Sequence, residues 1–474
     1  MNTRPKRSRI CGPFLAFGLT AVVVTGLFNS LCAPAAGQVS ESQASQLVVY
    51  LDNLDLVQSV AEVTLEEMSL AGASGDRPLR LAMGKFTSNQ PRTDQVRLAD
   101  EEIPAGSYLG LRFRLGVNYT VDDTVEVTDS VVASVPLGLQ LGPGEIAAVF
   151  LEFGVSGAAD SSGRAGVEIA IAEPRIPPFN ALLFVTNEGS RNISVLDKHS
   201  NRVVDVLAGG KRPLGMAYSR FARELYVADA GDHTVAVIDV TTRQMIRQLR
   251  LNLDDEPTRL ALSPDGQRLY VLNEGSHSVA MFDAGSDQEL GRFSVDLHAV
   301  SLDVDPSSGW VYIANELSDN ISLYDPSEET VVTTIPAGSL PTEIALVIPE
   351  GLVCVASSAQ RIITVLSSST GNLQATFGLC AIATGLAYDR VQGMMYVAAG
   401  ECHEITAFRP ANVLSTGQVP LPGAPGLLTI DEENRRLYAI LPEQNRLAVI
   451  NLTGRRIAAV VEVGDKPYMA MAAQ

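Results

Sequence analysis

A similar stretch of sequence recurs seven times along most of the chain, and this repeat limits the possible folds more than any other feature. Each copy contains an apolar run around an aromatic residue, as in "ELYVAD" and "RLYVLN", and a later run such as "VAVID" or "VAMFD". The spacing between copies is the same in every step except that from the second copy to the third, which is slightly longer. The central positions of the first run are Phe184, Tyr226, Tyr270, Tyr312, Cys354, Tyr396 and Tyr438. Such a constant period is typical of a repeat architecture.

Each copy has room for four short strands separated by turns, and "SPDGQR" carries an Asp-Gly pair typical of a hairpin. Four strands in each of seven copies predict a seven-bladed β-propeller over residues 181–474. The first copy lacks its leading strand, whereas the C-terminal "GDKPYMAMAAQ" is a leading strand with no copy after it. We therefore expect the C-terminal strand to complete the first blade and close the ring, which leaves no free sheet edge. An open solenoid is the alternative, but it does not need matching incomplete ends.

Residues 43–173 lack the repeat but remain rich in strand patterns. Runs such as "SQLVVYLDNL", "SYLGLRFRLGV" and "IAAVFLEFGV" alternate apolar and polar residues between turns. This pattern predicts an N-terminal antiparallel β-sandwich of seven or eight strands. Residues 174–180, which include three prolines, are expected to form a stiff linker. The whole chain is therefore expected to be all-β.

The first 37 residues have the pattern of a secretory signal peptide. A basic segment precedes an apolar run, and "APAAGQ" then supplies small residues at cleavage spacing. The basic residues are Arg4, Lys6, Arg7 and Arg9. An uncleaved anchor, or a lipoprotein modified at Cys32, is the less favoured alternative. We therefore expect an exported protein, in the periplasm, at the cell surface or secreted, with no transmembrane segment in its mature chain. Its net charge of −19 argues against nucleic acid as a partner.

The sequence of the repeats resembles that of a known family. "LYVAD", "HTVAVIDVTTRQMI" and "PTRLALSPDGQRLYVLNEG" resemble the YVTN-type propeller repeats of bacterial and archaeal surface-layer and exported proteins, over about residues 180–474. The later copies depart from the motif, because Cys354 replaces the aromatic residue and Ser367, Arg409 and Asn451 replace the aspartate. The resemblance implies an extracytoplasmic scaffold or binding module. Propellers of this kind also resemble lactonases and the heavy chains of quinoprotein or amine dehydrogenases.

Two of the three cysteines beyond the leader are placed to form a disulfide. Cys380 precedes the first strand of the sixth copy and Cys402 follows the second strand, at equal distances from a turn centred on Val391. Residues at equal distances from a hairpin turn face each other, at a spacing that suits a disulfide. A metal or redox role for the pair is the alternative. Cys354 occupies the aromatic position and is expected to be a buried thiol.

Three charged residues are predicted near the propeller axis. Arg259, Asp303 and Glu343 lie on the first strands of successive copies. They are candidates for binding a polar ligand at the channel mouth, and the alternative is an ion-pair network that satisfies itself.

Three histidines are candidate metal ligands. His233, His277 and His298 fall in loops at one end of neighbouring copies, where imidazoles could bind zinc or copper. The alternative is a tolerant exposed turn position, because other copies have Arg191, Asp319, Arg361 or Asn445 at the slot of His233 and His277. The acidic "LDDEP" loop could hold calcium or could simply be solvated. No cofactor is predicted beyond a possible metal ion.

These observations give two hypotheses for function. The first is a non-catalytic exported protein that uses the top face of the propeller to bind protein or glycan at the cell envelope. The second is a propeller enzyme, lactonase-like or similar to a dehydrogenase heavy chain, with a metal or cofactor at the channel mouth. The sequence gives no indication of the oligomeric state.

Overall fold

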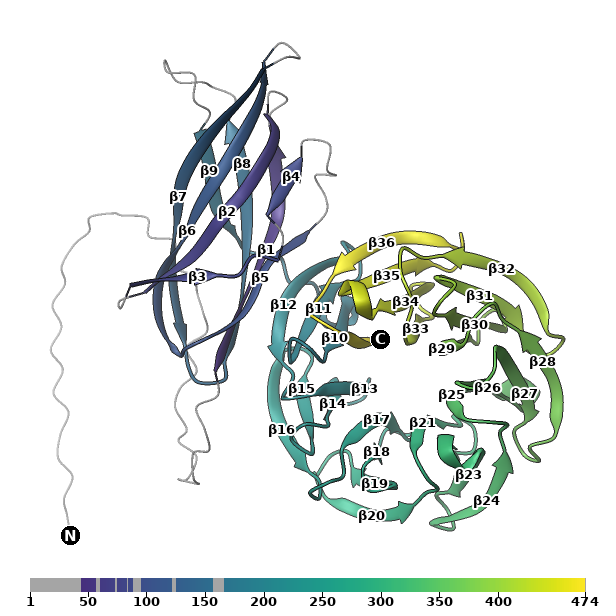
Figure 1. The fold of residues 1–474 in the computed structure, drawn as a ribbon. Helices are drawn as coiled ribbons and strands as arrows, with labels where there is room; N and C mark the ends of the chain where they lie inside the picture. Colours follow the sequence, from purple (N-terminus) through teal and green to yellow (C-terminus); the bar gives the residue numbers. More distant parts are fainter. Residues whose placement is uncertain are drawn as a thin grey trace, which may run out of the picture. The chain divides into compact units, whose positions relative to one another are not determined.

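The repeats fold into seven four-stranded sheets arranged around a centre (Figure 1). We describe residues 44–56, 60–72, 75–82, 84–87, 95–121, 125–156 and 166–473 of a computed structural model. The proposed signal peptide, residues 1–37, lies outside them. No helix in the described segments is long and apolar enough to cross a membrane.

The propeller begins at a short 3-10 helix, η1 (Phe179–Ala181), and each blade is an antiparallel sheet. Blade one contains β37 (Pro467–Ala472), β10 (Leu182–Asn187), β11 (Asn192–Asp197) and β12 (Arg202–Ala208). Blade two contains β13 (Pro213–Ser219), β14 (Glu224–Asp229), β15 (Thr234–Asp239) and β16 (Gln244–Arg250). Blade three contains β17 (Pro257–Leu262), β18 (Arg268–Asn273), β19 (Ser278–Asp283) and β20 (Glu289–Ser294). Blade four contains β21 (Ala299–Val304), β22 (Val311–Asn315), η2 (Glu316–Ser318), β23 (Asn320–Asp325) and β24 (Thr330–Pro336).

The remaining three blades follow the same order. Blade five contains β25 (Pro341–Val347), η3 (Ile348–Glu350), β26 (Leu352–Ser357), β27 (Ile362–Ser367) and β28 (Leu373–Gly378). Blade six contains β29 (Ala383–Asp389), β30 (Met394–Ala399), β31 (Glu404–Arg409) and β32 (Leu414–Pro420). Blade seven contains β33 (Leu428–Asp431), β34 (Arg436–Leu441), η4 (Pro442–Gln444), β35 (Arg446–Asn451) and β36 (Arg456–Glu462).

Ring closure by the C-terminal strand is confirmed. Strand β37 pairs antiparallel with β10, and Phe184 lies opposite Met471. The innermost strand of blade one therefore comes from the far end of the chain, close to the centre of the ring (Figure 1).

The recurrent residues have specific structural roles. The second strand of a blade, such as β14, is buried along nearly its whole length because neighbouring blades cover both of its faces. The asparagine that ends β10, Asn187, donates to Asn192 Oδ1 at 2.8 Å and to Ser194 Oγ at 3.0 Å across the sheet. The aspartate that ends the third strand accepts from the backbone of the following turn, as Asp239 does from the N–H groups of Thr241 and Thr242.

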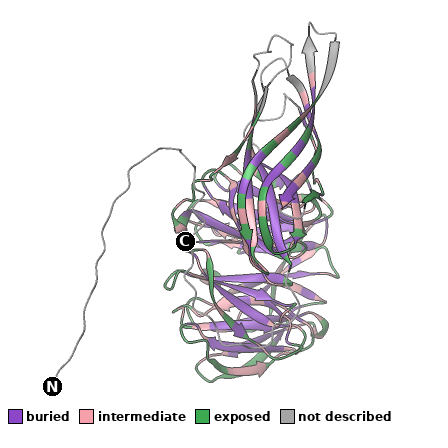
Figure 2. Ribbon diagram, turned by 90° about the vertical axis from the view of Figure 1, so that its left-hand side faces the viewer, coloured by how far each residue is buried: buried purple, intermediate pink, exposed green. Residues whose placement is uncertain are grey.

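The N-terminal region is a sandwich of two sheets. One sheet has the order β5 (Val96–Ile103), β1 (Ser45–Leu56), β8 (Ile146–Ser156), β9 (Gly166–Ala172). The other has the order β3 (Gly75–Leu79), β2 (Val60–Gly72), β6 (Gly106–Val121), β7 (Val125–Leu141), and β4 (Lys85–Thr87) pairs with β2. One pair departs from the antiparallel prediction, because β1 runs parallel to β8. Buried side chains from both sheets, among them Phe113 and Phe153, form the sandwich core. Along the sandwich strands, buried positions are interspersed with exposed ones (Figure 2).

A second apolar cluster joins the sandwich to the propeller. Val48, Tyr50 and Phe150 of the first sheet pack in one cluster with residues of blades one and seven, including Val203 and Val461. The rings of Tyr50 and Phe150 stack with centroids 5.5 Å apart. Residues 43–474 accordingly form one compact unit.

Candidate functional site

The first strands of blades one to six carry an irregularity in their pairing with the second strands. In blades two to six the register shifts just after the first residue of this strand, for example between Pro257 and Arg259, and between Pro341 and Glu343. Such bulges turn a side chain away from its regular position. Arg259, Ser301 and Glu343 are the first residues to pair with the second strand after the bulge in their blades.

These three residues form one hydrogen-bonded group. Arg259 Nη2 donates to Glu343 Oε2 at 2.6 Å, and Ser301 Oγ donates to Glu343 Oε1 at 2.9 Å. The Arg259 and Glu343 side chains are only 14% and 15% exposed. Burial raises the pKa of Glu343, while the Arg259 charge opposes this shift. Most of the Arg259–Glu343 charge is therefore neutralised within the pair.

Asp303, the third residue predicted to bind a polar ligand, does not join that group. Its carboxylate accepts hydrogen bonds from the backbone of Leu346 at 3.0 Å and of Val304 at 2.9 Å. Burial raises the pKa of Asp303 to about 6, although the two backbone bonds and the charge of Arg390 act against the shift. Asp303 can therefore take up or release a proton near neutral pH.

Two cavities lie along the axis. The central cavity, of about 470 Å³, is lined by Arg259, Asp303 and Glu343 together with Arg390. A second cavity of about 530 Å³ lies at the mouth, and we call it the mouth cavity. Its walls include apolar groups of Leu427, Pro442, Pro467 and Tyr468, with Glu188, Arg259, Glu443 and Lys466 among the charged groups. Arg259 belongs to both cavities and lies 5.6 Å from the centre of the Tyr468 ring.

The mouth opens on the face formed by the loops that lead into each blade and the loops between second and third strands. We call this the top face, and its loops are residues 188–191, 209–212, 230–233, 251–256, 274–277, 295–298, 316–319, 337–340, 358–361, 379–382, 400–403, 421–427, 442–445 and 463–466.

The top face carries two short chains of polar side-chain contacts. Arg212 bridges Glu188, at 3.1 Å, and Glu256, at 3.6 Å. His298 similarly lies between Glu274, at 3.1 Å, and Glu316, at 2.8 Å.

The predicted metal ligands have different surroundings from one another. His298 contacts two carboxylates, whereas His233 Nδ1 accepts from the backbone N–H of Glu256 at 3.4 Å. His277 Nδ1 is buried without a hydrogen-bond partner. Within the described segments, no group of three or more His, Cys, Asp or Glu side chains could hold a metal ion. A metal role for His233, His277 and His298 therefore remains a prediction without structural support.

The acidic loop of blade three is held by internal bonds. Asp255 is buried and pairs with Arg292 at 2.7 Å, and it accepts from the backbone N–H of Asn252 at 2.8 Å. Asp254 and Glu256 in the same loop have left-handed backbone conformations, with φ of 69° and 48°.

Cys380 and Cys402 form a disulfide with their Cα atoms 6.3 Å apart, and Cys354 is a buried free thiol. The pairing depends on a bulge in this hairpin, in addition to the equal distances from the turn. The register steps by one residue between Ala383 and Gly385, and only this step brings the two cysteines opposite each other.

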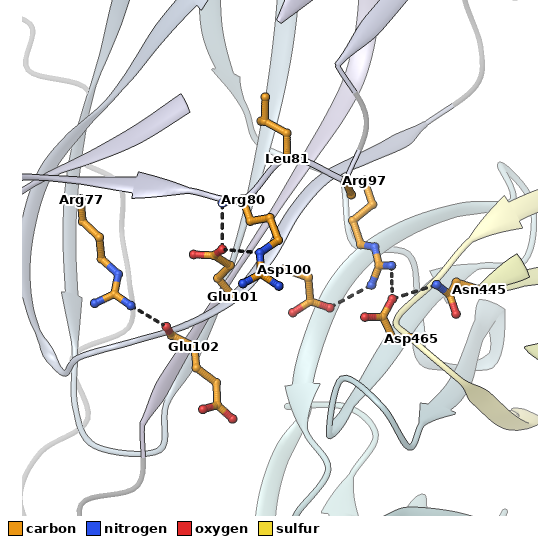
Figure 3. A pocket seen from close by; sticks show the side chains of 10 residues that line it. Arg77, Arg80, Leu81, Arg97, Asp100, Glu101, Glu102, Asn445 and Asp465 are labelled. Atoms are coloured by element: carbon orange, nitrogen blue, oxygen red, sulfur yellow. Dashed lines mark hydrogen bonds and ion pairs between the residues drawn. The ribbon is translucent and has the colours of Figure 1, made fainter. Parts of the chain in front are cut away.

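A further cavity, of about 500 Å³, lies where the sandwich meets the top face of blades one and seven (Figure 3). Arg97 of β5 donates to Asp100 at 2.9 Å and also contacts Asp465 in the loop before β37. Ser190 Oγ donates to Asp100 at 2.6 Å, and Asn445 donates to Asp465 at 2.9 Å. The charges that line this cavity are thus largely matched to one another.

Several of these groups were not anticipated from the sequence. Tyr468 could have been found, because its place after Pro467 on a first strand puts it near the axis. Arg97 and Asp465 could not, since they come from regions that share no repeat, 368 residues apart.

Comparisons with known proteins agree with this architecture. The model of the family described as "Lactonase, 7-bladed beta-propeller" matches residues 216–378, about a third of the chain. No curated protein matches the chain significantly. Kuenenia stuttgartiensis hydrazine synthase is similar in structure, with a TM-score of 0.52 and 17% identity, over 58% of this chain and 93% of that one.

A second solved structure, dihydro-heme d1 dehydrogenase NirN in complex with DHE, has a TM-score of 0.49 and 13% identity over 61% of this chain and 66% of that one, which is too low to support an inference. Because the identity to hydrazine synthase is also low, that likeness concerns the fold alone. The region from residue 182 to 472 is thus a seven-bladed β-propeller, and its blades two to five are similar to the lactonase propeller family.

Proposed function

We propose that the protein is an exported, non-catalytic binding protein that holds a small polar ligand, such as the terminal unit of a glycan, in the mouth cavity. The observation that carries this proposal is the composition of that cavity. The ring of Tyr468 and the side chains of Leu427 and Pro442 form an apolar wall, and charged groups of both signs lie around it.

A sugar unit matches this combination. Its ring presents an apolar face of C–H groups, and its hydroxyls both donate and accept hydrogen bonds. Binding pockets generally join an apolar lining to a few polar groups that fix orientation. The cavity of about 530 Å³ is large enough for one or two such units.

The polar groups of the site favour binding over catalysis. Arg259 and Glu343 bond to each other at 2.6 Å, so the base and the cation that a reaction would need are already paired. Glu443 and Lys466 are exposed at the mouth, where they can meet a ligand without losing a buried partner.

The test is a screen of saccharides by saturation-transfer NMR, followed by calorimetry on the protein and two variants. We expect Tyr468→Ala to weaken binding of any saccharide found in the NMR screen by about tenfold or more, because the stacking surface is lost. Phe221→Ala, which removes an exposed aromatic ring outside the mouth, is the matched control and should bind normally. Absence of saccharide binding, or binding that Tyr468→Ala leaves unchanged, would contradict the proposal.

Export is tested separately. We expect the mature protein to lack about the first 37 residues and to appear outside the cytoplasm. Intact mass measurement of the protein purified from cell fractions checks this. A full-length cytoplasmic product would contradict export but not ligand binding.

A lactonase-like hydrolase is the second candidate, and two observations favour it. The family match at residues 216–378 contains Arg259, Asp303 and Glu343. Asp303 also titrates near pH 6 beside Arg390, as a general base acting near neutral pH should. Hydrolysis of a panel of lactones, lost in Asp303→Asn and retained in Phe221→Ala, would establish this activity in place of the binding role.

A further inference from the structure

One sector of the top face differs from the rest in both polarity and charge. The exposed large apolar side chains of the described top-face loops are Leu253, Leu297 and Leu317, which are 83%, 57% and 62% exposed. All three lie in loops of blades three and four. Single exposed leucines are ordinary, but three within four consecutive loops concentrate apolar surface in one part of this face.

The four loops of this sector are also uniformly acidic. Residues 251–256, 274–277, 295–298 and 316–319 contain seven Asp or Glu residues and no Lys or Arg. The other ten top-face loops contain five acidic and five basic residues. We call the four loops the acidic leucine sector. Its acidic residues are Asp254, Asp255, Glu256, Glu274, Asp296, Glu316 and Asp319.

Backbone hydrogen bonds make the sector continuous. The N–H of Glu274 donates to the carbonyl of Glu256 at 3.2 Å, which joins the first loop to the second. The N–H of Val295 donates to the carbonyl of His277 at 3.0 Å, which joins the second to the third.

The third and fourth loops are tied more directly. The N–H of Leu317 donates to the carbonyl of Leu297 at 3.3 Å, so these two leucines lie side by side in neighbouring loops. The N–H of Leu297 in turn donates to Ser318 Oγ at 3.0 Å. The Asp255–Arg292 pair fixes the loop that carries Leu253. Loops held in this way lose little conformational entropy when a partner binds, which favours a recognition role.

We propose that the acidic leucine sector is a docking surface for a partner polypeptide segment that presents apolar side chains flanked by lysine or arginine. The leucines supply the apolar anchors, and the exposed carboxylates of Asp254, Asp296 and Asp319 supply the complementary charge. An acidic segment or a nucleic acid would be repelled. A second copy of this chain, with its net charge of −19, is disfavoured for the same reason. This surface is distinct from the mouth cavity, so its test is independent of the proposed function.

The experiment is selection of a random peptide library displayed on phage against the immobilised protein, followed by fluorescence anisotropy with the enriched peptides. We expect apolar residues flanked by Lys or Arg to be enriched. Leu297→Ser with Leu317→Ser should weaken binding of these peptides by about tenfold or more. Asp254→Asn with Asp296→Asn should weaken binding less, and mainly at low salt.

Leu373→Ser with Leu414→Ser is the matched control, because it removes two leucines of similar exposure, 62% and 58%, from the outer strands β28 and β32. It should leave peptide binding unchanged. Thermal melting of every variant verifies that the fold is intact. The proposal is overturned if no peptide is enriched, if the enriched peptides are acidic, or if the double leucine variant binds them as the wild type does.

Discussion

The amine of Lys198 lies 3.0 Å from Asp431 Oδ2 and donates to the carbonyl of Ala473 at 2.8 Å, in a site where both charged side chains are at most 2% exposed. This contact joins blade one to blade seven and to the closing strand. The equivalent position in other blades holds an apolar or small residue, as in Val240, Ala284 and Leu452. The lysine thus occurs where the two ends of the ring meet.

Lys198→Ala is expected to destabilise the fold strongly. It leaves the buried Asp431 carboxylate with only the side chain and backbone of Asn434, and breaking one partner of a buried pair typically costs about 3–5 kcal/mol. Urea unfolding measures the change. Lys85→Ala is the matched control, because it removes an exposed, solvent-screened pair with Glu62 and should destabilise the fold far less. Equal effects of the two substitutions would show that Lys198 does not hold the ring closed.

Arg97 is expected to keep the sandwich attached to the propeller after the linker is cut. Trypsin can cleave after Arg175, which is exposed in the proline-rich segment. The nicked wild type should elute as one species, because the cluster around Tyr50 and the bonds of Arg97 hold the halves together. In Arg97→Ala the Asp100 carboxylate is left buried without its cation, so the nicked halves should separate in size-exclusion chromatography.

Arg112→Ala, which removes an exposed pair with Asp76, serves as the control for this experiment and should remain associated. Co-elution of the nicked Arg97→Ala halves would show that the apolar cluster alone is sufficient.

Asp303 is expected to make stability depend on pH. Its pKa is raised by burial from 3.8 to about 6, so between these pH values the folded chain holds a proton that the unfolded chain has released. The contribution of this group to stability is therefore greatest below about pH 4, declines as pH rises, and is lowest above about pH 6. Asp303→Asn cannot ionise, so its free energy of unfolding should rise by about 3 kcal/mol relative to that of the wild type between acidic and neutral pH. A difference that stays constant with pH in urea unfolding would contradict the raised pKa.

The disulfide between Cys380 and Cys402 is expected to add modest stability. It closes a loop with a sequence separation of 22, for which chain entropy gives about 3 kcal/mol at most. The hairpin is also held by its own backbone bonds, so we expect a smaller loss in Cys380→Ser with Cys402→Ser. Thermal melting with and without reductant measures the loss, and alkylation should label both cysteines only after reduction. Labelling of either one without reductant would mean that the disulfide is absent from the protein.

The repeat carried most of the information that the sequence held about the fold. Its nearly constant period placed Tyr226, Tyr270 and their equivalents in successive blades, and the unmatched C-terminal strand predicted the pairing of β37 with β10. Positions within the period also identified Arg259 and Glu343 as neighbours at the axis. They belong to blades three and five, and the bonds between them depend on the bulges that follow Pro257 and Pro341.

What the repeat does not cover could not be predicted in this way. The parallel pairing of β1 with β8 joins segments far apart in the sequence, which no local pattern specifies. Docking of Arg97 on Asp465 depends equally on the folded shapes of two regions. The mouth cavity required side-chain positions as well, since Tyr468 and Pro442 come from different blades and meet only in the closed ring.

The pairing of β37 with β10, the first strand of the propeller in chain order, also sets the order in which the propeller can fold. Residues Leu183 and Ala472 become neighbours only after all the blades between them have been made and folded. Until then one edge of β10 has no partner strand, and a strand from another molecule could pair with its free backbone groups. Translation or translocation that stalls before β37 would therefore leave an aggregation-prone intermediate, and the cell would need to protect it until β37 is available to pair.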